Sequence, residues 1–107
     1  MFARRISIHL KPNTLAEFTK AVENDIVPLL RKQTGFQDEI TFALPESNKV
    51  LAISLWDTQK NPENYNSGDY QNVLKLLGTV IDGTPKVGIT EVLHSTFHQI
   101  RTAAPAA

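Results

Sequence analysis

The chain has 107 residues, with 11 Lys and Arg against 11 Asp and Glu, and it contains no cysteine. This length fits one domain with one modest core, and the balanced charge gives no long-range field that would recruit nucleic acid or an anionic membrane surface. The absence of cysteine excludes disulfides, thiolate nucleophiles and cysteine-ligated metal sites.

The first predicted element is a strand over residues 2–10, where apolar and polar side chains alternate. The apolar positions are Ile6, Ile8 and Leu10, and the polar positions between them are Arg5, Ser7 and His9. This period of two predicts a strand with one apolar face. Because polar residues interrupt the segment, we expect neither a signal peptide nor a membrane span, and we expect a cytoplasmic location.

A helix is predicted next, from Thr14 to about Lys32. Thr14 and Glu17 have the spacing of a capping box, and Gly35 suits the left-handed residue that follows a helix. Apolar residues recur at helical spacing at Leu15, Phe18, Val22, Ile26, Leu29 and Leu30. Pro28 removes one backbone hydrogen bond, so we expect a local kink in a helix that continues past it.

Two strands joined by a turn are predicted over residues 36–44 and 49–56. The first alternates apolar and polar residues, and PESN at 45–48 supplies turn residues. The second is apolar at nearly every position from Val50 to Leu55, which is typical of a strand covered on both faces.

A second helical region and a last strand complete the pattern. A short turn from about Pro62 precedes a helix from Asp69 to Leu77, and branched residues predict a strand over residues 86–97. One face of the helix carries Tyr70, Val73, Leu74 and Leu77.

The order of elements predicts the α+β ferredoxin-like arrangement βαββαβ, an antiparallel four-stranded sheet with both helices on one face. We expect a single domain over residues 1–101 and a mobile tail over residues 102–107. The strand at 49–56 is apolar on both faces, and helices on one side cannot cover both. We therefore expect a homodimer in which two sheets pack face to face.

Four segments stand out beside this pattern: IVPLLRKQTGF at 26–36, SLWD at 54–57, YNSGDY at 65–70 and EVLHSTFH at 91–98. Together they resemble the antibiotic biosynthesis monooxygenase family of dimeric α/β barrels, over about residues 2–98. The resemblance implies a dimeric α/β barrel with a pocket between sheet and helices in each subunit. It also implies that Trp56 occupies the position of a tryptophan that lines this pocket.

The resemblance leaves several activities open, because the family includes cofactor-independent oxygenases of aromatic polyketides or quinols as well as haem-degrading enzymes. Haem-degrading relatives carry a histidine on the second helix, where this chain has Leu74, and leucine cannot ligate iron. We therefore expect no haem and no other cofactor. Polyketide-type relatives carry an asparagine shortly before the tryptophan, where this chain has Ala52 and Ser54.

His9 is the predicted catalytic residue, because oxygenation without a metal or flavin needs a proton acceptor and a substrate that ionises. Arg5 and Ser7 point to the same side of the first strand, and with Ser54 they are predicted to contact the substrate. The alternative for His9 is a strand-end side chain that hydrogen-bonds to solvent or backbone.

The rings of Trp56, Tyr65 and Tyr70 are the remaining predicted substrate contacts. Trp56 ends a buried strand, so we expect its ring to line a cavity and to stack on a flat ligand. Tyr70 shares a helical face with core residues, and both tyrosines are expected mainly to hold the second helical region over the cavity. The alternative is that all three rings only fill the seam between sheet and helix.

Metal and nucleic-acid sites are not expected. His94 and His98 are four residues apart, but on a strand this spacing separates them by roughly 13 Å, too far for one ion. The third strand also lacks the internal aromatic residues with which a ferredoxin-like RNA-binding module stacks on bases.

Two functions from different classes remain. The first is a small cofactor-independent monooxygenase-like protein acting on an aromatic or quinone-like small molecule. The second is a non-catalytic dimeric domain that binds a ligand or another protein. A cavity beside Trp56 with His9 exposed to it favours the first, whereas a cavity blocked by Phe42, Tyr70 and Leu77 favours the second.

Overall fold

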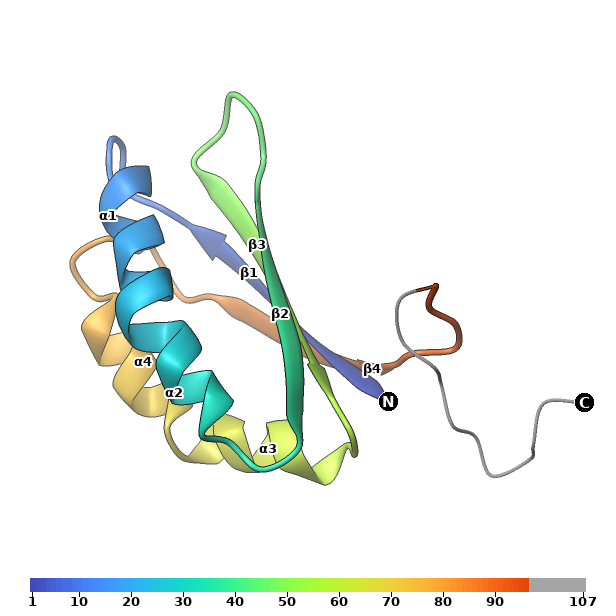
Figure 1. Cartoon of the computed structure of the whole chain (residues 1–107). Coiled ribbons are helices and arrows are strands. Elements are labelled where there is room, and N and C mark those ends of the chain that lie inside the picture. The colour runs from blue at the N-terminus through green and yellow to red at the C-terminus, as the bar shows by residue number, and fades with distance from the viewer. Residues whose placement is uncertain (97–107) are drawn as a thin grey trace, which may run out of the picture.

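The structure, a computed structural model, describes residues 1–96, which form a four-stranded sheet with helices on one of its faces (Figure 1). Along the chain the elements are β1 (Phe2–His9), α1 (Leu15–Ala21), the π-helical turn η1 (Val22–Ile26), α2 (Val27–Arg31), β2 (Phe36–Ala43), β3 (Lys49–Trp56), α3 (Lys60–Ser67), α4 (Tyr70–Leu76) and β4 (Lys86–Glu91). This order confirms the predicted α+β ferredoxin-like fold. The expected domain end at residue 101 and the expected tail at residues 102–107 lie outside the described residues.

The sheet has the strand order β2-β3-β1-β4, and every neighbouring pair is antiparallel. Alternate residues of each strand therefore face either the helices or the open side. On β1 the residues that face the helices are Arg4, Ile6 and Ile8, and all three are buried. The residues between them are exposed on the open side of the sheet.

The first helical layer is one continuous rod made of α1, η1 and α2. Pro28 lies in the first turn of α2, directly after the π-helical turn. A π-helical turn changes the hydrogen-bond spacing from four residues to five, so the rod stays helical where proline lacks its amide hydrogen. The predicted continuation past Pro28 is thus confirmed. The predicted capping box is wrong, because the Thr14 hydroxyl instead donates to the Lys11 carbonyl oxygen at 2.7 Å.

The second helical region consists of the two short helices α3 and α4, which are separated at Gly68, as the sequence predicts. Tyr65 and Tyr70 lie on either side of this break, and both are buried. β4 ends at Glu91 and is shorter than the predicted strand, because its neighbour β1 begins at Phe2, which pairs with Glu91.

Gly35 joins α2 to β2 with a positive φ of 80°. A Cβ atom at this position would collide with the side chains of Asp57 and Asn61. The Asp57 backbone N–H donates to the Gly35 carbonyl oxygen at 3.0 Å, and the Asp57 carboxylate accepts from Asn61 Nδ2 at 2.7 Å. Glycine therefore allows the start of β2 to touch the chain just after β3.

The open face of the sheet carries exposed apolar side chains. Ile40 and Phe42 are 54% and 45% exposed, and their neighbours on β3 are Ile53 and Leu51. Such a face is what a sheet-to-sheet homodimer requires, and the homodimer stays a prediction.

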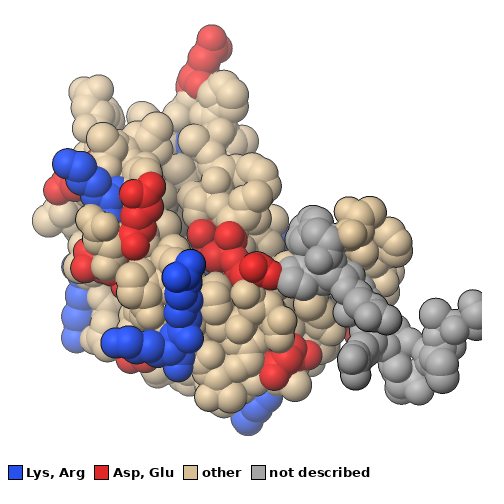
Figure 2. All heavy atoms as spheres, viewed as in Figure 1, with Lys and Arg blue, Asp and Glu red and all other residues tan. Residues whose placement is uncertain are grey.

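Acidic and basic side chains intermix on the face shown in Figure 2, in keeping with a formal net charge of zero. No helix within residues 1–96 combines the length and the apolar character needed to cross a membrane. The expected cytoplasmic location and the expected lack of a nucleic-acid partner stay predictions.

Candidate functional site

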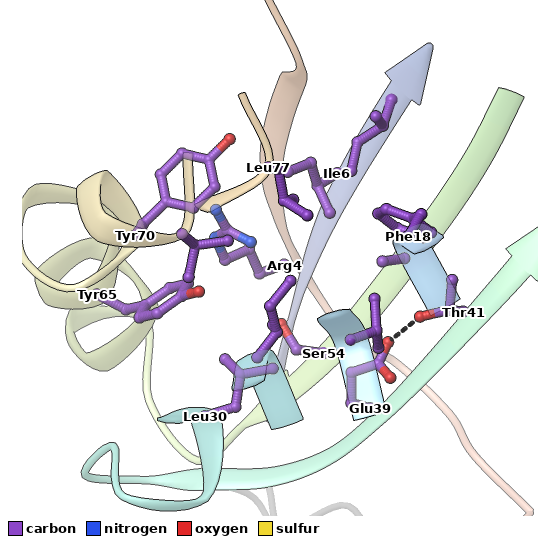
Figure 3. Close-up of a pocket in the computed structure, with 15 residues that line it drawn as sticks. Arg4, Ile6, Phe18, Leu30, Glu39, Thr41, Ser54, Tyr65, Tyr70 and Leu77 are labelled. Atoms are coloured by element: carbon purple, nitrogen blue, oxygen red, sulfur yellow. Dashed lines mark hydrogen bonds between the residues drawn. The ribbon is translucent and has the colours of Figure 1, made fainter. Parts of the chain in front are cut away.

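A cavity of about 50 Å³ lies between the sheet and the helices (Figure 3). Its walls are mostly apolar and come from β1, β2 and β3, from the first helical rod, and from α3 and α4. Six of the lining residues are polar or ionisable: Arg4, Glu39, Thr41, Ser54, Tyr65 and Tyr70. A few polar groups that converge in an apolar cavity are typical of a small-molecule site.

Three of these residues form one row across the floor of the cavity. The register of β2 with β3 places Glu39 beside Ser54, and the register of β1 with β3 places Ser54 beside Arg4. Adjacent strands lie about 4.8 Å apart, so the Cα atoms of Glu39 and Arg4 are separated by roughly 10 Å. The floor therefore has an acidic end and a basic end, with a hydroxyl group between them.

Arg4 is a buried cation at the basic end, with 4% of its surface exposed. Its Nε donates to Asn66 Oδ1 at 2.6 Å, and its guanidinium carbon lies 4.8 Å and 4.3 Å from the ring centroids of Tyr65 and Tyr70. Its Nη2 has no hydrogen-bond partner among residues 1–96. Burial lowers the pKa of this guanidinium, but an arginine side chain remains charged in a protein.

Tyr65 and Tyr70 close the cavity from the helical side, with Arg4 between their rings and Ser54 (Figure 3). Burial raises the pKa of Tyr65 to about 12, against the opposing effect of the Arg4 charge. Burial also raises the pKa of Tyr70, again against Arg4. Both hydroxyl groups are therefore protonated near neutral pH and are able to donate hydrogen bonds to a ligand.

Glu39 supplies the carboxyl group at the acidic end, where Thr41 Oγ1 donates to Glu39 Oε2 at 2.5 Å. Burial raises the pKa of this carboxyl group, and the hydrogen bond from Thr41 opposes that effect. A carboxylate with a raised pKa is a stronger base than one in water. Glu39 is thus a proton acceptor on the cavity wall.

Trp56 is completely buried, at 0% exposure, and it is not among the side chains that line the cavity. Its ring centroid lies 5.7 Å from that of Phe36 and 5.7 Å from that of Tyr65. The prediction that Trp56 lines the cavity is wrong, because α3 covers the end of β3 and places Tyr65 against the indole. Tyr65 and Tyr70 pack in the core, as predicted, and they also line the cavity.

Arg5, Ser7 and His9 lie on the open face of β1, opposite the cavity, because they alternate with the residues that face the helices. The seven predicted site residues are therefore divided between two faces of the sheet, and no single pocket unites His9 with the aromatic rings in residues 1–96. Phe42, whose ring would have blocked the cavity under the non-catalytic alternative, also lies on the open face. A catalytic role for His9 stays a prediction that concerns the open face.

Arg4, Glu39 and Thr41 line the cavity but were not among the predicted site residues. Arg4 does carry a signal, because it lies two residues before Ile6 on the apolar face of β1. Glu39 and Thr41 carry none, since they alternate with apolar Ile40 and Phe42, and such a strand is expected to turn its polar residues to solvent. In the structure Glu39 and Thr41 face the cavity, and Ile40 and Phe42 lie on the open side.

Metal ligands are not clustered in the described part of the chain, where no group of three or more His, Asp or Glu side chains is arranged to hold an ion. His94 is exposed beyond β4, and His98 lies outside the described residues. The expectation of no metal and no cofactor stays a prediction.

No protein-family model matches the sequence, and no curated protein is significantly similar to it. Solved structures do match the fold. A monooxygenase of Streptomyces coelicolor from the gene ActVA-Orf6, in complex with nanaomycin D, has a TM-score of 0.73 at 14% identity, and the match covers 92% of each chain.

Two further structures match equally well. A Bordetella bronchiseptica protein, described as a candidate antibiotic biosynthesis monooxygenase, has a TM-score of 0.73 at 23% identity, over 87% of this chain and 98% of its own. A Nitrosomonas europaea protein of unknown function has a TM-score of 0.73 at 14% identity, over 89% of this chain and 91% of its own. At such identities the likeness concerns the fold and not the activity. The chain therefore has the α+β fold of the antibiotic biosynthesis monooxygenase structures.

Proposed function

We propose that the chain is a small cofactor-independent monooxygenase that acts on an aromatic or quinone-like small molecule bound in the cavity. The observation that carries the proposal is Glu39, a carboxylate with a raised pKa on the floor of a cavity whose opposite wall is formed by Tyr65 and Tyr70. The fold shared with the S. coelicolor monooxygenase supports it.

The reaction needs no cofactor if the substrate supplies the electrons. A phenol with a free ring C–H loses its hydroxyl proton to Glu39, and the phenolate transfers one electron to dioxygen. The two radicals combine to form a carbon–oxygen bond, and Glu39 returns the proton to give a hydroperoxide. Glu39 then removes the ring proton while the O–O bond breaks, and it protonates the departing hydroxide. One phenol and one dioxygen thus give one quinone and one water.

The size of the cavity restricts the substrate. An apolar cavity of about 150 Å³ holds benzene, so a cavity of about 50 Å³ must widen to admit a single ring. The break at Gly68 is the natural place for this movement, because it separates the two helices that carry Tyr65 and Tyr70. Single-ring phenols are therefore favoured over polycyclic ones.

Oxygen uptake with single-ring phenols that have a free para position tests the proposal, with the protein-free solution as the blank. We expect one quinone for each dioxygen consumed, and we expect Glu39→Gln to lower turnover about 100-fold or more. Glu63→Gln, at an exposed carboxylate on α3, is the matched control and should leave turnover unchanged. Full activity of Glu39→Gln together with loss in His9→Asn would place the chemistry on the open face instead.

A second candidate function is a non-catalytic dimeric domain that binds a ligand or another protein. The exposed apolar side chains of Ile40 and Phe42 favour it, since such a face is typical of an interaction surface. Binding of phenols without any oxygen uptake would identify this function.

A further inference from the structure

Arg4 is a buried cation that has no carboxylate partner within residues 1–96. Its side chain reaches the cavity beside the rings of Tyr65 and Tyr70, and its Nη2 makes no hydrogen bond to the described part of the chain. Burial of a charge is costly unless the charge is paired and all its hydrogen-bonding groups are satisfied. One donor of this cation is therefore left for a group that is not part of the described chain.

The surroundings of Arg4 compensate its charge only in part. Tyr65 and Tyr70 offer the faces of neutral rings, and Asn66 offers a neutral amide oxygen at 2.6 Å from Nε. The Tyr70 side chain also lies within hydrogen-bonding reach of the guanidinium, although Nη2 itself has no partner within residues 1–96. Glu39 lies two strands away and is hydrogen-bonded to Thr41. The basic end of the cavity floor thus keeps a positive charge that its neutral partners compensate only in part.

Ser54, in the middle of the row, adds a second donor next to Arg4. Its Oγ accepts a hydrogen bond from Trp56 Nε1 at 2.8 Å, and it lies beside Arg4 in the β1–β3 register. A hydroxyl group that accepts one bond still has its own hydrogen to donate. Two donors, one of them charged, are therefore adjacent on the floor of a mostly apolar cavity.

We propose that the cavity binds its ligand as an anion, through an oxygen that accepts hydrogen bonds from Nη2 of Arg4 and from the hydroxyl of Ser54. The ligand class is a small organic molecule with a carboxylate or phenolate oxygen. The inference deepens the proposed function, on which it rests only for the phenolate: Arg4 and Ser54 stabilise the phenolate that forms when the substrate loses its proton, which is the form that reacts with dioxygen.

Trp56 makes binding measurable. It is the chain's one tryptophan, its Nε1 is hydrogen-bonded to Ser54, and its ring contacts that of Tyr65. An anion that engages Ser54 and Arg4 changes the polar surroundings of the indole, so the fluorescence of Trp56 reports on the site.

The test compares pairs of probes that have nearly the same shape but differ in charge, without oxygen. Benzoate is titrated against benzamide, and the smaller propionate against propionamide, which requires less widening of the cavity. We expect the wild type to bind at least one of the carboxylates about 10-fold more tightly than its amide, a difference of about 1.4 kcal/mol. Arg4→Met should bring the two affinities within about twofold of each other.

Arg5→Met is the matched control, because Arg5 is the next residue of β1 and faces the open side. It should keep the preference for the carboxylate, and benzoate or propionate should raise the melting temperature of the wild type and of Arg5→Met but not of Arg4→Met. The proposal would be overturned if the wild type bound carboxylate and amide equally in both pairs. It would also be overturned if Arg4→Met kept the wild-type preference for the carboxylate. The comparison of carboxylate with amide affinity in the wild type tests the proposal even if Arg4→Met fails to fold.

Two further observations separate the ligand types and the two proposals. Titration of 4-nitrophenol below its own pKa shows by its visible absorption whether it binds ionised, as expected of a phenolate site, or neutral, which would leave the carboxylate as the ligand. Anion binding without any oxygen uptake would refute the proposed oxygenase and leave this inference standing, whereas oxygen uptake with no preference for anions would do the reverse.

Discussion

Trp56 donates a hydrogen bond from Nε1 to Oγ of Ser54 at 2.8 Å, and both residues face the helices from β3. The indole is completely buried, so a smaller ring at this position leaves both a void and an unpaired hydroxyl. We expect Trp56→Phe to lower the free energy of unfolding by about 2 kcal/mol. Denaturant unfolding measures it, and Ser54→Ala removes the same bond from the other side. The loss of unfolding free energy in the double variant should be about 1 kcal/mol smaller than the sum of the losses in the two single variants. Strict additivity would mean that the hydrogen bond contributes nothing to stability.

Substitution of Gly35 and Gly83 by alanine distinguishes the cost of backbone strain from the cost of a steric clash. Both have a φ of 80°, but a Cβ atom on Gly35 would meet Asp57, whereas one on Gly83 has nothing within 4 Å. We expect Gly83→Ala to cost about 1 kcal/mol through its backbone alone, and Gly35→Ala to cost about 2 kcal/mol or more. Thermal or denaturant unfolding of the two variants gives the comparison, and equal losses would contradict the contact with Asp57.

The raised pKa of Glu39 predicts a pH-dependent stability. The folded state binds the proton of the Glu39 carboxyl group more tightly than the unfolded state does. The contribution of this group to folding stability is therefore complete in acid and is lost as the pH rises through the folded-state pKa. We expect Glu39→Gln to be more stable than the wild type near neutral pH and equal to it in acid. Glu63→Gln, at an exposed position, should show no such difference.

Thr41 provides a second test of the same carboxyl group. Its hydroxyl donates to Glu39 and opposes the effect of burial, so Thr41→Val should raise the pKa of Glu39 further. Carboxyl chemical shifts followed by NMR during a pH titration measure the midpoint. A lower midpoint in Thr41→Val would show that the hydrogen bond is not made in solution.

Tyr65 and Tyr70 are the chain's two tyrosines, so their ultraviolet absorbance can be followed without interference from others. Burial raises the pKa of Tyr65 to about 12, above the value of about 10 in an unfolded chain. The stability due to this group is therefore complete below pH of about 10 and decreases as the pH rises toward 12. Tyr65→Phe should reduce this alkaline loss, and ionisation of both tyrosines near pH 10 in the folded protein would be inconsistent with their burial.

The open face of the sheet predicts the homodimer. A face-to-face interface of this kind buries roughly 2,000 Å² or more, and Phe42 lies on this face. We expect the wild type to sediment as a dimer and Phe42→Lys to sediment as a folded monomer. Leu76→Lys is the control, because Leu76 is about as exposed, at 47%, but belongs to α4 on the helical side. A folded wild-type monomer at micromolar concentration would refute the dimer.

The sequence by itself determined the order and type of the elements. The period of two in residues 2–10 and the helical spacing from Leu15 to Leu30 depend only on which side chains avoid water, and both patterns are visible in one dimension. The turn at Gly35 is equally local, because its positive φ requires the backbone freedom of glycine. The break at Gly68 is local too, because the asparagine and glycine residues of this segment disfavour one continuous helix. These signals sufficed for the fold.

Only the tertiary structure decided what each face of the sheet meets. A bulge between Phe36 and Asp38 shifts the register, so that Phe36 packs on Trp56 while Ile40 faces the open side. Glu39 therefore enters the cavity, although nothing in its sequence neighbours predicts this. The site joins residues from β1, β2, β3 and the second helical region, and their meeting depends on strand pairing and helix packing between distant segments, which no local pattern in the chain contains.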